Sequence, residues 1–98
     1  MADSTVHVGV LSLELYFASV GSLKGKRSIL KSLLDRIRGK FNVSAAEIGE
    51  LDKWQKSICG VSMIGNDKSF LDAALQKVVS FVEQQGDLEL IDYQIVFT

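Results

Sequence analysis

The sequence has no proline, one cysteine and one histidine, and this scarcity narrows what the protein can be. A single cysteine, Cys59, cannot form an internal disulfide, and with one histidine the chain cannot assemble a Cys/His zinc site. We therefore expect no metal and no cofactor, and a reducing, cytoplasmic environment suits the cysteine content. No apolar run approaches the roughly 18 residues that a membrane-spanning helix needs, so no membrane contact is expected.

The chain nevertheless contains enough apolar residues for a folded domain. Hydrophobic residues make up 47% of its 98 residues and charged residues 23%, which is typical of globular rather than disordered chains. A chain of this length buries roughly two-thirds of its unfolded surface, so it can form a core without disulfides or metal ions. We predict one domain over residues 1–98.

Hydrophobic periodicity predicts the element order βαββαβ. Alternating β-forming residues predict strands over 6–17, 41–48, 54–64 and 88–97. Apolar residues at helical spacing predict a helix over 23–39, capped by Ser22 and ended by Gly39. A second helix is expected from Asn66 or Asp67, its N-cap, to Gly86. Two interleaved right-handed crossovers then give an α+β, ferredoxin-like βαββαβ sandwich, with a four-stranded antiparallel sheet and both helices on one face.

In this topology one face of the sheet carries no helix, and we call it the open face. An apolar patch exposed on a soluble domain usually marks an interface, which predicts a homodimer formed through this face. The alternative is that strand twist and a bulge at Gly9 turn some of its valines inward. The residues expected on the open face are Val6, Val8 and Val10 of the first strand and Leu90 and Val96 of the last.

Trp54, at the start of the third strand, is a further candidate for the dimer interface, because tryptophan is enriched at binding hot spots. A half-buried hydrophobic residue at a strand start would explain it equally simply. Domains of RRM type share this topology and stack bases on aromatic residues of the two central strands. Here only Tyr16 and Trp54, at strand ends, are available, so base stacking on the sheet is not expected.

Basic residues are concentrated in the first predicted helix. Seven of the eleven lie between Ser22 and Lys40 against one acid, a net charge of +6, whereas the rest of the chain carries −7. On a helical wheel four cations line one flank over fourteen residues, a ridge about 21 Å long. Such a ridge suits a row of phosphates and predicts an RNA partner, ribosomal in the first instance. The residues predicted to bind nucleic acid are Lys24, Lys26, Arg27, Lys31 and Arg38.

Two other interpretations of the basic helix stay open. Lysines and arginines can simply solvate the outer edge of a surface helix, although the lack of interleaved glutamates argues against this, because Glu–Lys pairs four residues apart add stability. An acidic protein surface, including the acidic remainder of a second copy, is the other candidate partner.

No catalytic signature accompanies these features. The sequence has no glycine-rich phosphate loop of the right spacing and no nucleophile–base pattern. Cys59 lies in an apolar strand and His7 between valines, and both are expected to be structural. We expect the protein not to be an enzyme.

Five sequence blocks occur in order along the chain: VHVGVL at 6–11, SLKGKR at 22–27, FNVSAAE at 41–47, DKWQ at 52–55 and Asn66-Asp67. Together they resemble the YlxP-like family of small bacterial proteins. The resemblance implies a ferredoxin-like fold, no established activity and a suggested link to ribosome or translation factors. Gly25 stands where the family pattern generally has an acid. We expect a noncatalytic factor that binds structured RNA, the alternative being a dimeric protein-interaction or regulatory ligand-binding module with no nucleic-acid role.

Overall fold

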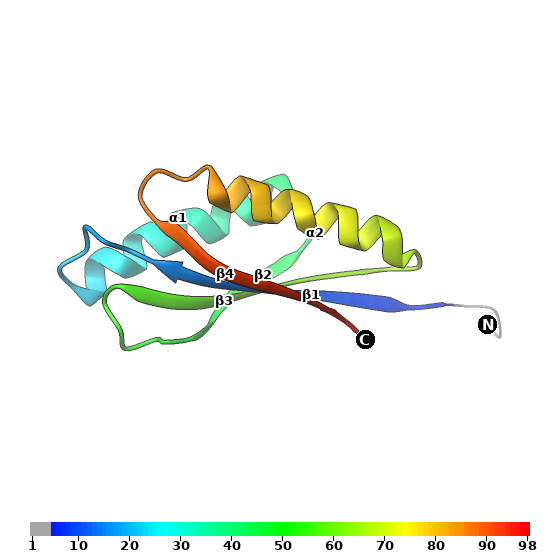
Figure 1. The fold of residues 1–98 in the computed structure, drawn as a ribbon, viewed down its shortest axis with the longest axis horizontal. Helices are drawn as coiled ribbons and strands as arrows, with labels where there is room; N and C mark the ends of the chain where they lie inside the picture. Colours follow the sequence, from blue (N-terminus) through cyan, green and yellow to red (C-terminus); the bar gives the residue numbers. More distant parts are fainter. Residues whose placement is uncertain (1–4) are drawn as a thin grey trace.

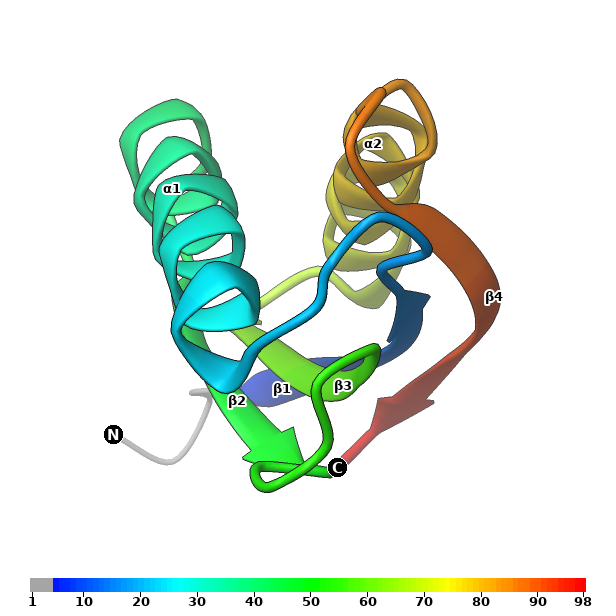
Figure 2. The same ribbon diagram turned by 90° about the vertical axis from the view of Figure 1, so that its left-hand side faces the viewer.

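Four strands and two helices follow one another in the predicted order. The structure is a computed structural model that describes residues 5–98; residues 1–4 of the predicted domain lie outside the described residues. The elements are β1 (His7–Tyr16), α1 (Leu23–Lys40), β2 (Ser44–Gly49), β3 (Lys56–Gly65), α2 (Lys68–Glu83) and β4 (Glu89–Phe97). The strands form one antiparallel sheet in the order β2-β3-β1-β4, and both helices cover the same face of it (Figures 1 and 2). The ferredoxin-like α+β prediction is confirmed.

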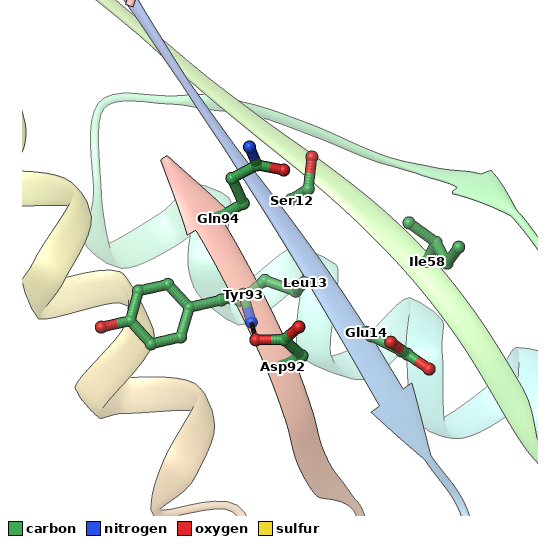
Figure 3. Close-up of a pocket in the computed structure, with 7 residues that line it drawn as sticks. All are labelled: Ser12, Leu13, Glu14, Ile58, Asp92, Tyr93 and Gln94. Atoms are coloured by element: carbon green, nitrogen blue, oxygen red, sulfur yellow. Dashed lines mark hydrogen bonds between the residues drawn. The ribbon is translucent and has the colours of Figure 1, made fainter. Parts of the chain in front are cut away.

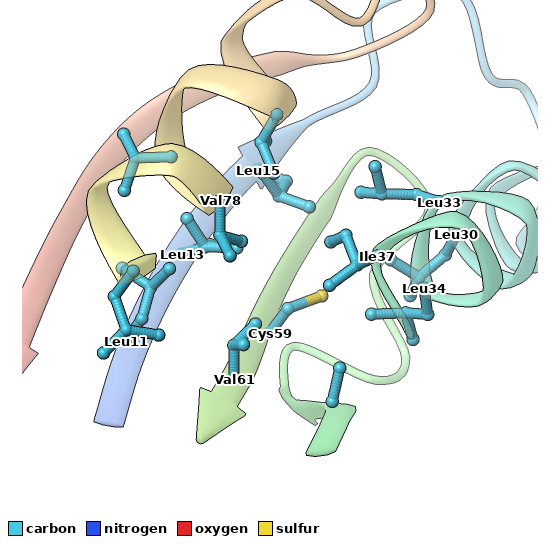
Figure 4. Close-up of a cluster of buried hydrophobic side chains, with 14 of the residues drawn as sticks. Leu11, Leu13, Leu15, Leu30, Leu33, Leu34, Ile37, Cys59, Val61 and Val78 are labelled. Atoms are coloured by element: carbon cyan, nitrogen blue, oxygen red, sulfur yellow. The ribbon is translucent and has the colours of Figure 1, made fainter. Parts of the chain in front are cut away.

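The core lies between the helices and the covered face of the sheet. Leu11, Leu13 and Leu15 of β1 are fully buried, since alternate residues of a strand point to the same side. They meet apolar residues of both helices and of β3 (Figure 4). The buried partners are Leu30, Leu33, Leu34 and Ile37 of α1, Leu71, Leu75, Val78, Val79 and Val82 of α2, and Cys59, Val61 and Met63 of β3.

Helix α1 does not end at Gly39 as predicted but runs through it to Lys40. The N–H of the capping residue Phe41 still donates to the carbonyl of Ile37, at 2.9 Å. Glycine lowers helix stability by about 1 kcal/mol relative to alanine, which this hydrogen bond and the packing of the last turn outweigh. Strand β2 accordingly begins at Ser44 rather than at Phe41.

The register of β1 shows which residues reach the open face. Strand β1 pairs with β3 without interruption from His7 opposite Gly65 to Tyr16 opposite Lys56, so there is no bulge at Gly9. Gly9 is buried on the helix side, where an added Cβ would lie 2.7 Å from Leu75. Val8 and Val10 therefore stay on the open face, as predicted.

A register shift on the other side of β1 corrects the expectation for β4. Glu14 pairs with Asp92, but Leu15 pairs with Leu90, so Ile91 is an extra residue on β4. The shift returns Leu90 to the helix side, where it packs against the core. Val96, opposite Val10, remains on the open face and is 47% exposed.

Candidate nucleic-acid interface

The amino-terminal end of α1 is capped in the predicted way. The Ser22 side chain accepts a hydrogen bond from the backbone N–H of Gly25, at 3.0 Å. The first turn of the helix itself carries no acidic residue. Because α1 buries its apolar stripe against the sheet, its basic flank faces away from the core. We call Lys24, Arg27, Lys31 and Arg38 the basic side of α1.

Lys24 and Arg27 are the most available cations of the basic side of α1. Both side chains are exposed. Within residues 5–98, neither makes an ion pair with a carboxylate. Both charges are therefore accessible to solvent.

Asp35 partly neutralises the other two cations. Its carboxylate lies 2.8 Å from Lys31 Nζ and 3.0 Å from Arg38 Nη1. The hydrogen bond from Lys31, with the charges of both neighbours, holds the pKa of Asp35 below its ordinary value of 3.8. The Lys31 side chain remains 78% exposed, and ion pairs this exposed are weak. Arg38 is less available, because its second terminal nitrogen donates to the carbonyl of Ala45 at 2.7 Å.

Lys26 is not part of the surface, and the prediction that it contacts phosphate is wrong. Its side chain is fully buried, with Nζ 3.0 Å from the Glu47 carboxylate. Nζ also donates to the carbonyls of Glu50, at 2.9 Å, and Lys56, at 3.0 Å. A buried ammonium needs such partners because desolvation without them is costly. The signal was present in the sequence: Lys26 lies four residues before Leu30, on the apolar stripe of the helix.

The carboxylate that binds Lys26 also organises two residues of β3. Glu47 Oε2 accepts a hydrogen bond from Ser57 Oγ at 2.8 Å, and Ser57 Oγ lies 3.5 Å from Cys59 Sγ. Burial raises the pKa of the Cys59 thiol to about 11, opposed by the contact with Ser57. The thiol is therefore protonated at neutral pH, and thiols in that form are poor nucleophiles.

Trp54 does not begin the third strand as predicted, because β3 starts at Lys56; it lies on the connection between β2 and β3, which runs from Glu50 to Gln55. It is 55% exposed and lines a hollow of about 270 Å³, which we call the Trp54 hollow. The residues around it are Tyr16, Lys53, Trp54, Gln55 and Lys56.

The predicted dimer residues do not form one patch. Tyr16, beside Trp54, pairs with Lys56, whereas Val8 pairs with Ile64 eight residues earlier along β1. At the rise of a strand this separation is about 26 Å. Val6 lies just before β1 and is 62% exposed. We call the group formed by Val8, Val10, Ile64 and Val96 the valine end of the open face.

The middle of the open face is polar. A shallow hollow of about 170 Å³ is lined there by Ser12, Glu14 and Ile58 together with Asp92 and Gln94, whereas the Tyr93 ring points toward α2 (Figure 3). Glu14 and Asp92 are register partners, and like charges directly opposite one another destabilise a sheet. This acidic centre separates the valine end from the Trp54 hollow and repels phosphate.

Within residues 5–98, no group of three or more His, Cys, Asp or Glu side chains is placed to hold a metal ion. Neither of the two helices in this range is long and apolar enough to cross a membrane.

Comparisons with known proteins agree with the resemblance drawn from the sequence blocks. The model of a family described as "Protein of unknown function (DUF503)" matches residues 8–95. The chain is also 35% identical over 82 residues to the uncharacterized protein YlxP of Bacillus subtilis (strain 168). That alignment covers 84% of this chain and 89% of the relative.

Proposed function

Because the chain belongs to the DUF503 family, whose description assigns no activity, we propose a function from its own charge and geometry. The protein is a noncatalytic factor that binds structured RNA, ribosomal RNA in the first instance, through the basic side of α1. The observation that carries this proposal is the exposure of Lys24 and Arg27, without ion-pair partners in residues 5–98, on a segment of net charge +6.

The phosphate contacts are assigned mainly to Lys24, Arg27 and Lys31. Lys31 lies seven residues after Lys24 in α1, about 10 Å further along the helix axis. Arg38 contributes less, because Asp35 and the Ala45 carbonyl already accept hydrogen bonds from its guanidinium group. Lys26 makes no contact with RNA and acts only inside the fold.

Charge elsewhere on the molecule favours approach from the side of α1. Outside residues 22–40 the chain has a net charge of −7, and Glu14 and Asp92 occupy the centre of the open face. Phosphates are therefore attracted to one side of the protein and repelled from the other.

We propose no catalytic role, since the one cysteine is buried with a raised pKa. The low cysteine content also fits a protein of the reducing cytoplasm.

The test is cosedimentation with purified ribosomal subunits over a series of salt concentrations. Replacing two phosphate contacts in Arg27→Glu/Lys31→Glu is expected to weaken binding at least tenfold and to reduce the salt slope by about 2, roughly one per lost contact. The control is Lys68→Glu/Lys77→Glu, which makes the same change of charge on α2. Equal binding by the wild type and the α1 variant, or an equal loss in the control, would contradict the proposal.

The valine end favours a second function, self-association or protein binding. Ile64 is 70% exposed and lies opposite Val8, and exposed Val96 lies opposite Val10. We propose a homodimer formed through these residues, with Val6 extending the contact. Dimer contact at this end leaves the basic side of α1 and the Trp54 hollow accessible, so the two functions are compatible. A complex with another protein that survives nuclease and high salt, with no RNA binding, would favour a purely protein-interacting module.

A further inference from the structure

The Trp54 hollow places two aromatic rings and two lysines together at one end of the sheet. Tyr16 is the last residue of β1, and Trp54 lies two residues before β3 begins. Lys53 and Lys56 line the same hollow, and both are exposed. These aromatics are far apart in sequence, and only the antiparallel pairing of β1 with β3 brings them side by side.

The loop that carries Trp54 is firmly attached, so exposure of the ring is not the result of a loose segment. The buried Nζ of Lys26 donates to the carbonyl of Glu50, the first residue of the loop, and to that of Lys56, the first residue after it. Gln55 binds the neighbouring connection: its Nε2 donates to the Ala18 carbonyl at 3.1 Å, and its carbonyl accepts from the Phe17 N–H at 2.8 Å. A fixed loop loses little conformational entropy when its side chains bind a ligand.

Helix α1 begins next to this loop. Lys26 lies between Lys24 and Arg27 in sequence, and its ammonium group reaches the loop directly. The start of α1 and the β2–β3 connection lie at the same end of the molecule in both views (Figures 1 and 2). RNA bound along α1 can therefore continue toward the Trp54 hollow.

We propose that the Trp54 hollow binds an unpaired base of the RNA, stacked on the Trp54 ring, with the adjoining phosphates against Lys53 and Lys56. Base stacking on aromatic side chains tolerates any sequence and combines with cations that follow the backbone. Asp52 lies in the same loop, and Glu89 is the register partner of Tyr16. Because both are acidic, they repel phosphates, which are therefore expected on the side of the two lysines. The inference rests on the proposed function and adds to it that the RNA has an unpaired nucleotide near the start of α1.

Trp54 is the only tryptophan of the chain, so intrinsic tryptophan fluorescence reports on this site alone. The experiment titrates the full-length protein with a hairpin RNA that has unpaired loop bases and, separately, with a fully paired duplex of equal length. We expect the hairpin to quench the fluorescence at saturation and the duplex to leave it unchanged. In parallel, the anisotropy of labelled hairpin should show about tenfold weaker binding by Trp54→Ala and little change in Trp54→Phe. The control is Phe70→Ala, which removes an exposed aromatic ring from α2 and should leave binding unchanged.

Other outcomes separate this inference from the proposed function. Hairpin binding that depends on Arg27 and Lys31 but neither quenches Trp54 nor weakens in Trp54→Ala overturns the base site and leaves the proposed function standing. Failure of the wild type to bind any RNA overturns both.

Quenching by adenosine monophosphate at the same concentrations as the hairpin, unaffected by Arg27→Glu/Lys31→Glu, identifies a free nucleotide as the ligand and overturns the RNA assignment. A fluorescence shift with protein concentration alone, accompanied by a doubled mass that Trp54→Ala abolishes, shows that a second copy fills the hollow and also overturns it.

Discussion

Lys26 places an ammonium group inside the protein, where it joins three parts of the chain. It links α1 to Glu47 on β2 and to the backbone on both sides of the loop that carries Trp54. Among residues 5–98, no buried side-chain nitrogen or oxygen lacks a hydrogen-bond partner, so the desolvation of this charge is compensated. Removal of the lysine alone would take this donor from the carbonyls of Glu50 and Lys56 and leave Ser57 Oγ as the remaining donor to the Glu47 carboxylate.

The variant Lys26→Met keeps the length of the side chain and removes its charge. Breaking one partner of a buried pair typically costs about 3–5 kcal/mol, so the free energy of unfolding should fall by that amount. Urea denaturation followed by circular dichroism measures it. The matched control is Lys24→Met, two residues away and exposed, which should change stability by less than about 0.5 kcal/mol. A loss below 1 kcal/mol in Lys26→Met would show that the buried network contributes little.

At the level of single residues, the sequence predicted exposure better than it predicted partners. Lys24 and Arg27 are exposed as expected because their wheel positions follow from local geometry alone. The wheel position of Lys26 on the apolar stripe indicated burial, but its partners could not be predicted, because Glu47 lies 21 residues further on and the other acceptors belong to the β2–β3 connection and the start of β3. The pairing of Lys31 and Arg38 with Asp35 was within reach of spacing rules, because the three residues are one helical turn apart.

Among the elements, α1 shows how packing overrides an unfavourable residue. Gly39 is helical, its φ is not positive, and a Cβ added there would meet nothing within 4 Å. The position therefore carries the entropic cost of glycine without any steric need for it.

The variant Gly39→Ala should stabilise the protein by about 0.5–1 kcal/mol, because alanine restricts the unfolded chain and fits the helix without strain. The increase is measured as a higher urea midpoint with an unchanged slope. Gly25→Ala is the comparison: its Cβ would lie 3.2 Å from the capping oxygen of Ser22, so a smaller gain or a loss is expected. Destabilisation by Gly39→Ala would mean that the last turn of α1 is not helical in solution.

Element order could be predicted from the sequence because hydrophobic periodicity is local, while details that depend on neighbouring strands could not. The extra residue at Ile91 exists only relative to β1, and it moved Leu90 from the open face to the core. The position at which α1 ends depends on the hydrogen bond from the Phe41 N–H to the Ile37 carbonyl. The presence of Gly39 alone does not predict whether that bond forms.

For the whole molecule, the open face is the surface through which we propose that two copies associate. Its valine end is apolar, whereas its centre carries Glu14 and Asp92. An interface confined to the valine end would leave Trp54, at the other end, accessible to a different partner.

Sedimentation at micromolar concentration should show a species near twice the 10.8 kDa of one chain. Val8→Asp places a charge in the middle of the valine end and should return the protein to a monomer, since a buried unpaired charge is costly. Phe70→Asp, on the helix layer, is the control and should remain dimeric. A wild-type monomer at these concentrations would remove the open face as a dimer interface.

Because the helices cover only one face of the sheet, a homodimer formed through the open faces would have its helices on the outside. Two copies joined through their open faces would carry their α1 helices on opposite outer sides, too far apart to grip one short duplex. The pair would instead be bivalent and bridge two separate RNA segments, or two distant parts of one folded RNA. Its apparent affinity would then depend on the spacing of those segments, through the effective concentration of the second site, more than on the strength of either contact.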